Sequence, residues 1–84
     1  MRFTAEITIM PHPELLDPQG KTVLNNLGHL DLSGVTDVRI GRHVAMQLDA
    51  ASEEEARRTV EQACQKLLAN PIVETFRYHL HPAS

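Results

Sequence analysis

The stretch RFTAEITIM, residues 2–10, alternates between polar and apolar side chains from Arg2 to Ile9. A period of two predicts a β-strand with one face on a hydrophobic core and the other toward water or a partner. Pro11 is expected to end this strand, because proline offers no amide hydrogen to a neighbouring strand. The apolar face consists of Phe3, Ala5, Ile7 and Ile9.

A first helix is predicted to begin at Asp17 and Pro18. The aspartate can accept a hydrogen bond from the open amides of the first turn, and proline has its backbone angle preset for the first helical position. Gly28 weakens the last turn, and residues 31–34 are expected to form a loop. The apolar residues that then share one helical face are Val23, Leu24, Leu27 and Leu30.

Residues 35–48 fit two structures, because their apolar side chains keep one parity on both sides of Gly41 and Arg42. A three-residue loop, 41–43, would pair Ile40 with Val44 in a hairpin, whereas one long strand bent at the glycine keeps the same face without a hairpin. A two-residue turn is disfavoured, because it would place the second half of the segment on the wrong face.

A second helix is predicted from Ser52 to Asn70, just before Pro71. Ser52 followed by Glu55 fits a capping box, and acidic side chains favour the positive end of a helix. Residues 72–80 then alternate as a last strand, with Ile72 and Phe76 on the same face. The expected apolar stripe of the helix consists of Ala56, Val60, Ala63, Cys64, Leu67 and Leu68.

This order of elements predicts one α+β domain over residues 1–84, an antiparallel sheet with two helices on one face, written β-α-β(β)-α-β. A domain of this size buries only about 60% of its unfolded surface, so support from a partner chain is expected. The second sheet face, with Thr4, Thr8 and Met10, carries too little charge for a fully solvated surface. We therefore expect an oligomer, with pairing or stacking of sheets between subunits as one hypothesis.

Composition excludes several classes of function. The 84 residues carry 8 Lys plus Arg against 11 Asp plus Glu, a net charge of −3, so nucleic-acid binding is not expected. The N-terminus does not fit a signal peptide, and no apolar run approaches the length of about 18 residues that a membrane span requires. One cysteine allows no internal disulfide, so a cytoplasmic location is expected.

No catalytic or metal-binding set emerges from the remaining residues. Cys64 falls on the apolar stripe of the second helix, where a cysteine is typically a small buried hydrophobe. His79 and His81 share a strand face, but a closed metal site would lack a third and a fourth ligand. We therefore expect no catalytic residues and no metal in this chain.

Three segments are left unexplained by pattern alone: LDPQG at 16–20, DVRIGR at 37–42 and KLLANPIVETFRY at 66–78. In this order and at these separations they resemble the PurS family, the small subunits of bacterial and archaeal phosphoribosylformylglycinamidine (FGAM) synthase. The resemblance spans nearly the whole chain. The sequence departs from the family in lacking an aromatic residue near His43 or Val44 and in ending HLHPAS where the family is more acidic, so the role of the tail stays open.

The resemblance implies a subunit without an active site of its own. It would join a PurL-type, ATP-dependent synthetase subunit and a PurQ-type glutaminase subunit in de novo purine synthesis, and it would associate with itself as a dimer or tetramer. The complex is an ATP-dependent, glutamine-hydrolysing ligase, in which ammonia from glutamine converts formylglycinamide ribonucleotide to the amidine. ATP and magnesium are expected in the large subunit, with no cofactor bound by this chain.

On this reading the three segments supply the residues expected to face a partner. Gly20 is a poor helix former, which favours close approach of another backbone, and Arg39 and Arg42 flank the bend at Gly41 as favoured polar contacts. Glu74 and Arg77 are expected either to pair across a dimer or to stay within one subunit. The partner-interface candidates are Asp17, Gln19, Gly20, Arg39, Gly41, Arg42, Asn70, Glu74 and Arg77.

A function of a different class competes with this one. Two helices on an antiparallel sheet are also the architecture of regulatory domains that bind amino acids at a dimer interface. Stabilisation by amino acids would favour that alternative, whereas co-purification with a synthetase and a glutaminase would favour the small subunit.

Overall fold

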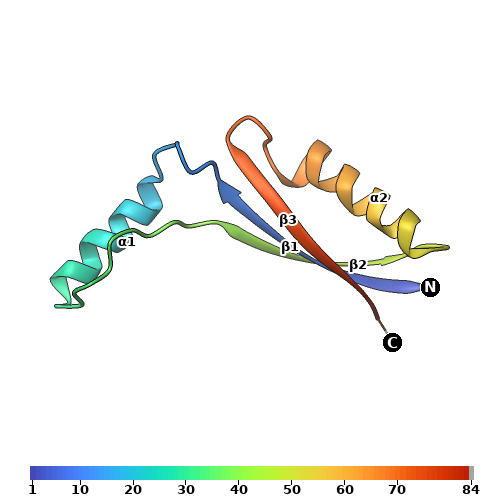
Figure 1. Ribbon diagram of the computed structural model, residues 1–84, viewed down its shortest axis with the longest axis horizontal. Helices are drawn as coiled ribbons and strands as arrows, with labels where there is room; N and C mark the ends of the chain where they lie inside the picture. Colours follow the sequence, from blue (N-terminus) through green and yellow to red (C-terminus); the bar gives the residue numbers. More distant parts are fainter. Residues whose placement is uncertain (84) are drawn as a thin grey trace.

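A computed structural model describes residues 1–83 of the chain, so Ser84, the end of the C-terminal tail, lies outside the described residues. The chain forms a three-stranded antiparallel sheet and two helices in the order β-α-β-α-β (Figure 1). The α+β class with an antiparallel sheet and two helices is confirmed. The molecule is elongated, with extents of 51 × 29 × 15 Å.

β1 (Arg2–Pro11) is the central strand, with β2 (Arg42–Asp49) and β3 (Glu74–Pro82) antiparallel on either side. Ile7 lies opposite Val44 in β2 and Tyr78 in β3, so apolar residues of all three strands share one face. The predicted alternation in residues 2–10 is confirmed, since the apolar side chains of β1 are almost completely buried. They are Phe3, Ala5, Ile7 and Ile9.

α2 (Glu53–Ala63) covers this face, with Val60 completely buried against β1. Ser52 accepts a hydrogen bond from the Glu55 amide at 3.1 Å, which confirms the predicted cap. The helix then continues as η1 (Cys64–Leu68), a π-helical turn that ends with a bond from the Ala69 amide to the Cys64 carbonyl at 3.0 Å. The wider turn leaves Leu67 82% exposed, so the sequence pattern was wrong to place it on the buried stripe.

α1 (Pro18–His29) does not lie on the sheet (Figure 1). It extends beyond one end of the strands, opposite the chain termini, and the buried core contains no residue of this helix. The expectation of two helices on one face therefore holds for α2 alone. The physical reason is that residues 12–17 and 35–41, which lead to and from α1, carry the chain away from the sheet instead of folding back over it.

The structure contains neither alternative left open for residues 35–48, the hairpin or the one long strand bent at Gly41. The chain contains no hairpin here, because residues 35–40 belong to no strand and β2 starts only at Arg42, which pairs with Ile9 of β1. The last strand also starts later than expected, at Glu74 rather than Ile72. The reason is a hydrogen-bonded turn, in which the Asn70 side chain accepts from the Ile72 amide at 3.1 Å.

Candidate functional site at the joint of the molecule

The three segments that pattern alone left unexplained meet at one place. At this place β1 ends, β3 begins and the chain turns toward α1. We call this region the joint, and we call residues 12–41, which include α1, the arm. The backbone amide of His12 donates to the Val73 carbonyl at 2.9 Å, and the His12 ring contacts the Pro71 carbonyl at 3.3 Å. These contacts connect the loop after β1 to the turn before β3.

Asp17 connects the beginning of the arm to its end. One carboxylate oxygen accepts a bond from the Gly20 amide at 3.1 Å and caps α1, while the other accepts from the Ile40 amide at 2.7 Å. The Ile40 amide is the main reason that the pKa of Asp17 lies below its ordinary value, followed by the Gly20 amide and the nearby Arg39 charge. The Asp17 carboxylate is therefore charged and makes its hydrogen bonds within one chain.

Arg39 also points inward. Its guanidinium donates to the carbonyls of Leu15 at 3.0 Å, His12 at 2.6 Å and Pro11 at 3.4 Å. These bonds hold the loop between β1 and α1, whose backbone otherwise has few partners. The structure thus gives Arg39 a role in shaping the joint, in addition to the partner contact expected from the sequence.

Two glycines permit close contact between backbones at the joint. A side chain on Gly20 would overlap the Val38 carbonyl, and one on Gly41 would overlap the Ile9 carbonyl and the Met10 sulfur. The close approach expected at Gly20 is therefore made by the chain's own backbone.

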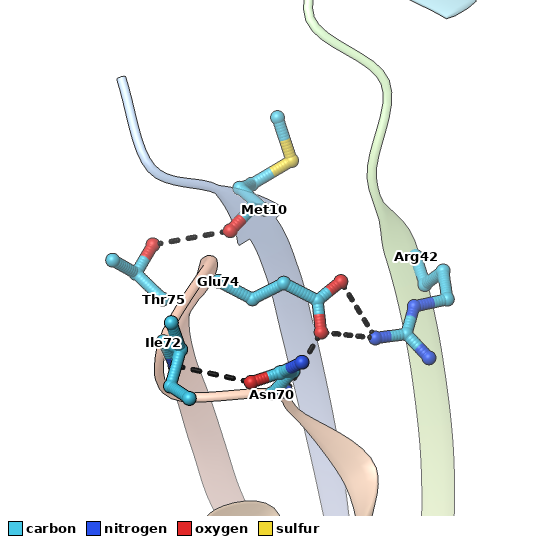
Figure 2. Close-up of polar contacts among 6 residues, drawn as sticks. All are labelled: Met10, Arg42, Asn70, Ile72, Glu74 and Thr75. Atoms are coloured by element: carbon cyan, nitrogen blue, oxygen red, sulfur yellow. Dashed lines mark hydrogen bonds and ion pairs between the residues drawn. The ribbon is translucent and has the colours of Figure 1, made fainter. Parts of the chain in front are cut away.

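Glu74 lies at the centre of a second set of polar contacts (Figure 2). Its carboxylate accepts from one Arg42 nitrogen at 2.7 and 2.8 Å and from the Asn70 amide at 2.8 Å, while the Thr75 hydroxyl nearby contacts the Met10 carbonyl at 3.5 Å. The Asn70 amide, then the Arg42 side chain, hold the pKa of Glu74 below its ordinary value. Glu74 therefore pairs within the subunit, where the sequence left open a pair across a dimer.

Two candidates remain free of such internal use. Gln19, in the first turn of α1, and Arg77, on the open face of the sheet, are exposed and make no side-chain hydrogen bond or ion pair among residues 1–83. Of the nine candidate residues, these two are the polar side chains left available to a partner.

Sequence reasoning missed the apolar part of the joint. An open groove of about 460 Å³ lies between the loop after β1 and the start of β3, and Leu15, Leu16 and Val73 are among its lining residues. Leu16 is 69% exposed, and Ile72, next to Val73, is 82% exposed. For Leu15 and Leu16 the available signal was position, because they lie between the expected first strand and first helix, whereas the sequence pattern assigns Ile72 and Val73 to the last strand. We call Leu15, Leu16, Ile72 and Val73 the joint surface.

The other chemical candidates have structural explanations. Cys64, the first residue of η1, is completely buried, and burial raises the pKa of its thiol. The His81 ring contacts the Glu6 carboxylate at 3.1 Å on the exposed face of the sheet. Within residues 1–83, no three His, Cys, Asp or Glu side chains are close enough together to hold a metal ion.

Comparisons with known proteins support the family resemblance that the three segments at the joint indicated. The sequence profile of the family described as PurS, phosphoribosylformylglycinamidine (FGAM) synthase, matches residues 4–82. A PurS subunit of FGAM synthase from Synechocystis is 32% identical over 93% of this chain and 78% of its own length.

Solved structures share the fold as well. A structure of PurS from Bacillus subtilis matches with a TM-score of 0.83 and 30% identity, over 94% of this chain and 98% of that one. A chain in the structure of PurLQS from Thermotoga maritima matches with a TM-score of 0.89 and 27% identity, over 96% and 99%. From the profile match over nearly all of its residues, the chain belongs to the PurS family of FGAM synthase subunits.

Proposed function

We propose that this protein is the small, non-catalytic subunit that joins a PurL-type synthetase to a PurQ-type glutaminase and supports ammonia transfer to formylglycinamide ribonucleotide. The observation that carries the proposal is the match to PurS over residues 4–82, whose segments 16–20, 37–42 and 66–78 converge on the joint. The Thermotoga structure described as PurLQS supports association with both larger subunits.

The chemistry explains why such a subunit is useful without an active site. Ammonia released from glutamine is a nucleophile only while it stays unprotonated, and bulk water both protonates and dilutes it. A rigid subunit that seals and orients the interface increases the rate through proximity and exclusion of water.

ATP and magnesium bind the large subunit on this proposal, and the complex works in the cytoplasm. Among residues 1–83, no helix has the length and apolar character of a membrane span.

The proposal includes association between copies of the chain, and the arm is the region that favours it. Over residues 12–41 the only buried side chain is that of Asp17, and the only other buried residue is Gly20, so the arm has no hydrophobic core. Leu30 and Leu32 are 67% and 53% exposed. The proposed cover is another copy of the same chain, because a domain of this size buries too little surface alone.

Native mass spectrometry tests this part. Leu30→Glu places a charge on the exposed apolar residue that caps the end of α1 and should convert the oligomer to monomer, because burial of an unpaired charge is costly. Ser33→Glu adds the same charge in the adjacent loop and should keep the oligomer. An unchanged mass for Leu30→Glu would contradict self-association through the arm and would favour the open sheet face that the sequence indicated.

Reconstitution of amidine synthesis tests the main function. The purified synthetase and glutaminase subunits are assayed with and without this protein, using either glutamine or ammonium as the nitrogen source. Turnover with glutamine should require the protein, because ammonia must pass between two subunits. If neither nitrogen source responds, the proposed function is wrong, and ligand-dependent stabilisation by amino acids becomes the next measurement.

A further inference from the structure

We propose that residues 35–41 of one copy pair with the outer edge of β2 in a second copy, so that each sheet receives a fourth strand from the other chain. The inference rests on the self-association within the proposed function and names the surface that this association uses. The occupant is a second copy of this chain, because the segment that fits the edge lies in the chain itself.

The outer edge of β2, the side away from β1, carries backbone groups without a strand partner among residues 1–83. Met1 and Ala50 exchange two backbone hydrogen bonds, at 3.0 and 2.9 Å, and bonded pairs alternate with non-bonded pairs along an antiparallel ladder. The even-numbered residues of β2 therefore bond to β1. The odd-numbered residues, which point their amides and carbonyls outward, include His43, Ala45 and Gln47.

Residues 35–41 present a matching edge. They run without a turn or bend from the arm into β2 (Figure 1). The Ile40 amide donates to Asp17 at 2.7 Å, so the backbone of this even-numbered residue faces the chain that follows β1. The backbone groups of Asp37 and Arg39 therefore point to the opposite side, which is the side of the outer edge of β2. An edge strand with unpaired backbone groups is a template for another strand.

Side-chain chemistry selects the register. The favoured register places the two copies of Arg42 opposite each other and brings apolar side chains together on the face that α2 covers, where the residues of β2 are only half-buried. A shift by two residues in one direction would place Asp37 opposite Asp49, and in the other direction Ile40 opposite Arg42. The opposed pairs of the favoured register are Ile40–Val44, Val38–Met46, Arg39–Ala45 and Asp37–Gln47.

The centre of this pairing is electrically balanced. Two arginines that face each other would repel, but within each copy the Glu74 carboxylate accepts from Arg42 at 2.7 and 2.8 Å. The sequence allows Ile40 to pair with Val44 in a hairpin, and a single chain does not form it. Two chains make the same pairs by exchanging identical segments, which is a low-cost route to a dimer.

The test is a cross-link between Asp37→Cys and Gln47→Cys in one double variant. Both positions are exposed, and an opposed pair lies within the roughly 4.4–6.8 Å between Cα atoms that a disulfide spans. Mild oxidation should give a covalent dimer on a non-reducing gel. Each single variant is a control that should stay uncrosslinked, because two copies of either position would lie about 34 Å apart along the strands. Cys64 is completely buried and should not take part.

Amide exchange of the unmodified protein gives a second readout that needs no substitution. In the associated protein the Ala45 amide should exchange at least about tenfold more slowly than in the dilute monomer, whereas the Met46 amide, bonded to β1, should be protected in both. An oligomer by native mass spectrometry that lacks either the cross-link or the protected Ala45 amide would overturn the strand exchange and leave self-association intact. A monomeric mass at every concentration would overturn both.

Discussion

The sheet with α2 and the arm with α1 are stabilised by different means. In the first region, β1 and α2 bury a continuous core that includes Ile7 and Val60, both completely buried. The arm, which is more than a third of the chain, buries only Asp17 and Gly20 and is held by polar contacts at its base. The difference teaches that one part of the chain is stabilised by its own hydrophobic core, whereas the other has no such core within a single chain.

The two amphipathic helices therefore differ in what covers their apolar stripes. α2 has its apolar stripe on the sheet and an acidic first turn, with Glu54 and Arg58 paired at 3.7 Å on the solvent side. α1 has an apolar stripe that meets no core within one chain. Burial of apolar surface dominates helix stability in proteins, so α1 is expected to need its partner for lasting order.

The largest expected effect is on the core. Ile7→Ala removes a completely buried side chain from the central strand and should lower the free energy of unfolding by about 3–4 kcal/mol. Leu27→Ala, the matched change in the half-buried stripe of α1, should cost under about 1 kcal/mol in the monomer. Urea unfolding at low protein concentration measures both, and equal losses would contradict the difference between the regions.

Gly20→Ala should have the next largest effect. The added methyl group would overlap the Val38 carbonyl, so the base of the arm must shift, at a cost of about 2 kcal/mol. Gly28→Ala, at a glycine of α1 with open space around it, should instead stabilise the helix by about 0.5–1 kcal/mol. Thermal unfolding of the pair should give shifts of opposite sign.

Glu74→Gln should have a smaller effect, a loss of about 1 kcal/mol, because the charge-assisted bond to Arg42 is partly exposed and the amide can still accept from Asn70. Glu54→Gln, which removes an exposed pair with Arg58 on α2, should cost less than about 0.5 kcal/mol. A larger loss for the second variant would contradict the importance of the joint.

Lowering the pH should gradually remove the stabilisation that the carboxylates give to the base of the arm. The folded-state pKa values of Asp17 and Glu74 lie below the ordinary values of 3.8 and 4.5, so the unfolded chain binds protons more readily. The stabilisation is complete above these ordinary values and is lost as pH falls through the lowered folded values. Unfolding followed from pH 6 to pH 2.5 should show this loss, and Asp17→Asn should reduce it; an unchanged profile for Asp17→Asn would contradict the role of this carboxylate.

Much of the fold was predictable because its signals are local. The alternation in residues 2–10 identified β1, Asp17 and Ser52 marked both helix starts, and the resemblance of three segments indicated the family. The destination of α1 was not predictable, since an apolar stripe shows that a helix needs cover and not which surface supplies it.

The candidate residues show a similar limit. Segment spacing singled out Asp17, Arg39 and Glu74, but a charged side chain in a loop serves equally well as a contact to a partner or to the chain's own backbone. Only coordinates reveal that their polar atoms are engaged internally. Ile72 illustrates a different error. Alternation placed it on the apolar face of the last strand, but the turn at Asn70 delays the start of that strand to Glu74 and leaves Ile72 exposed.

The most direct test of the different origins of stability is amide hydrogen exchange of the free protein over a range of concentrations. The account predicts that amides of β1 stay protected at every concentration, whereas amides of α1 exchange quickly in the dilute monomer and become protected as copies associate. Slow exchange of α1 in a protein shown by native mass to be monomeric would contradict it.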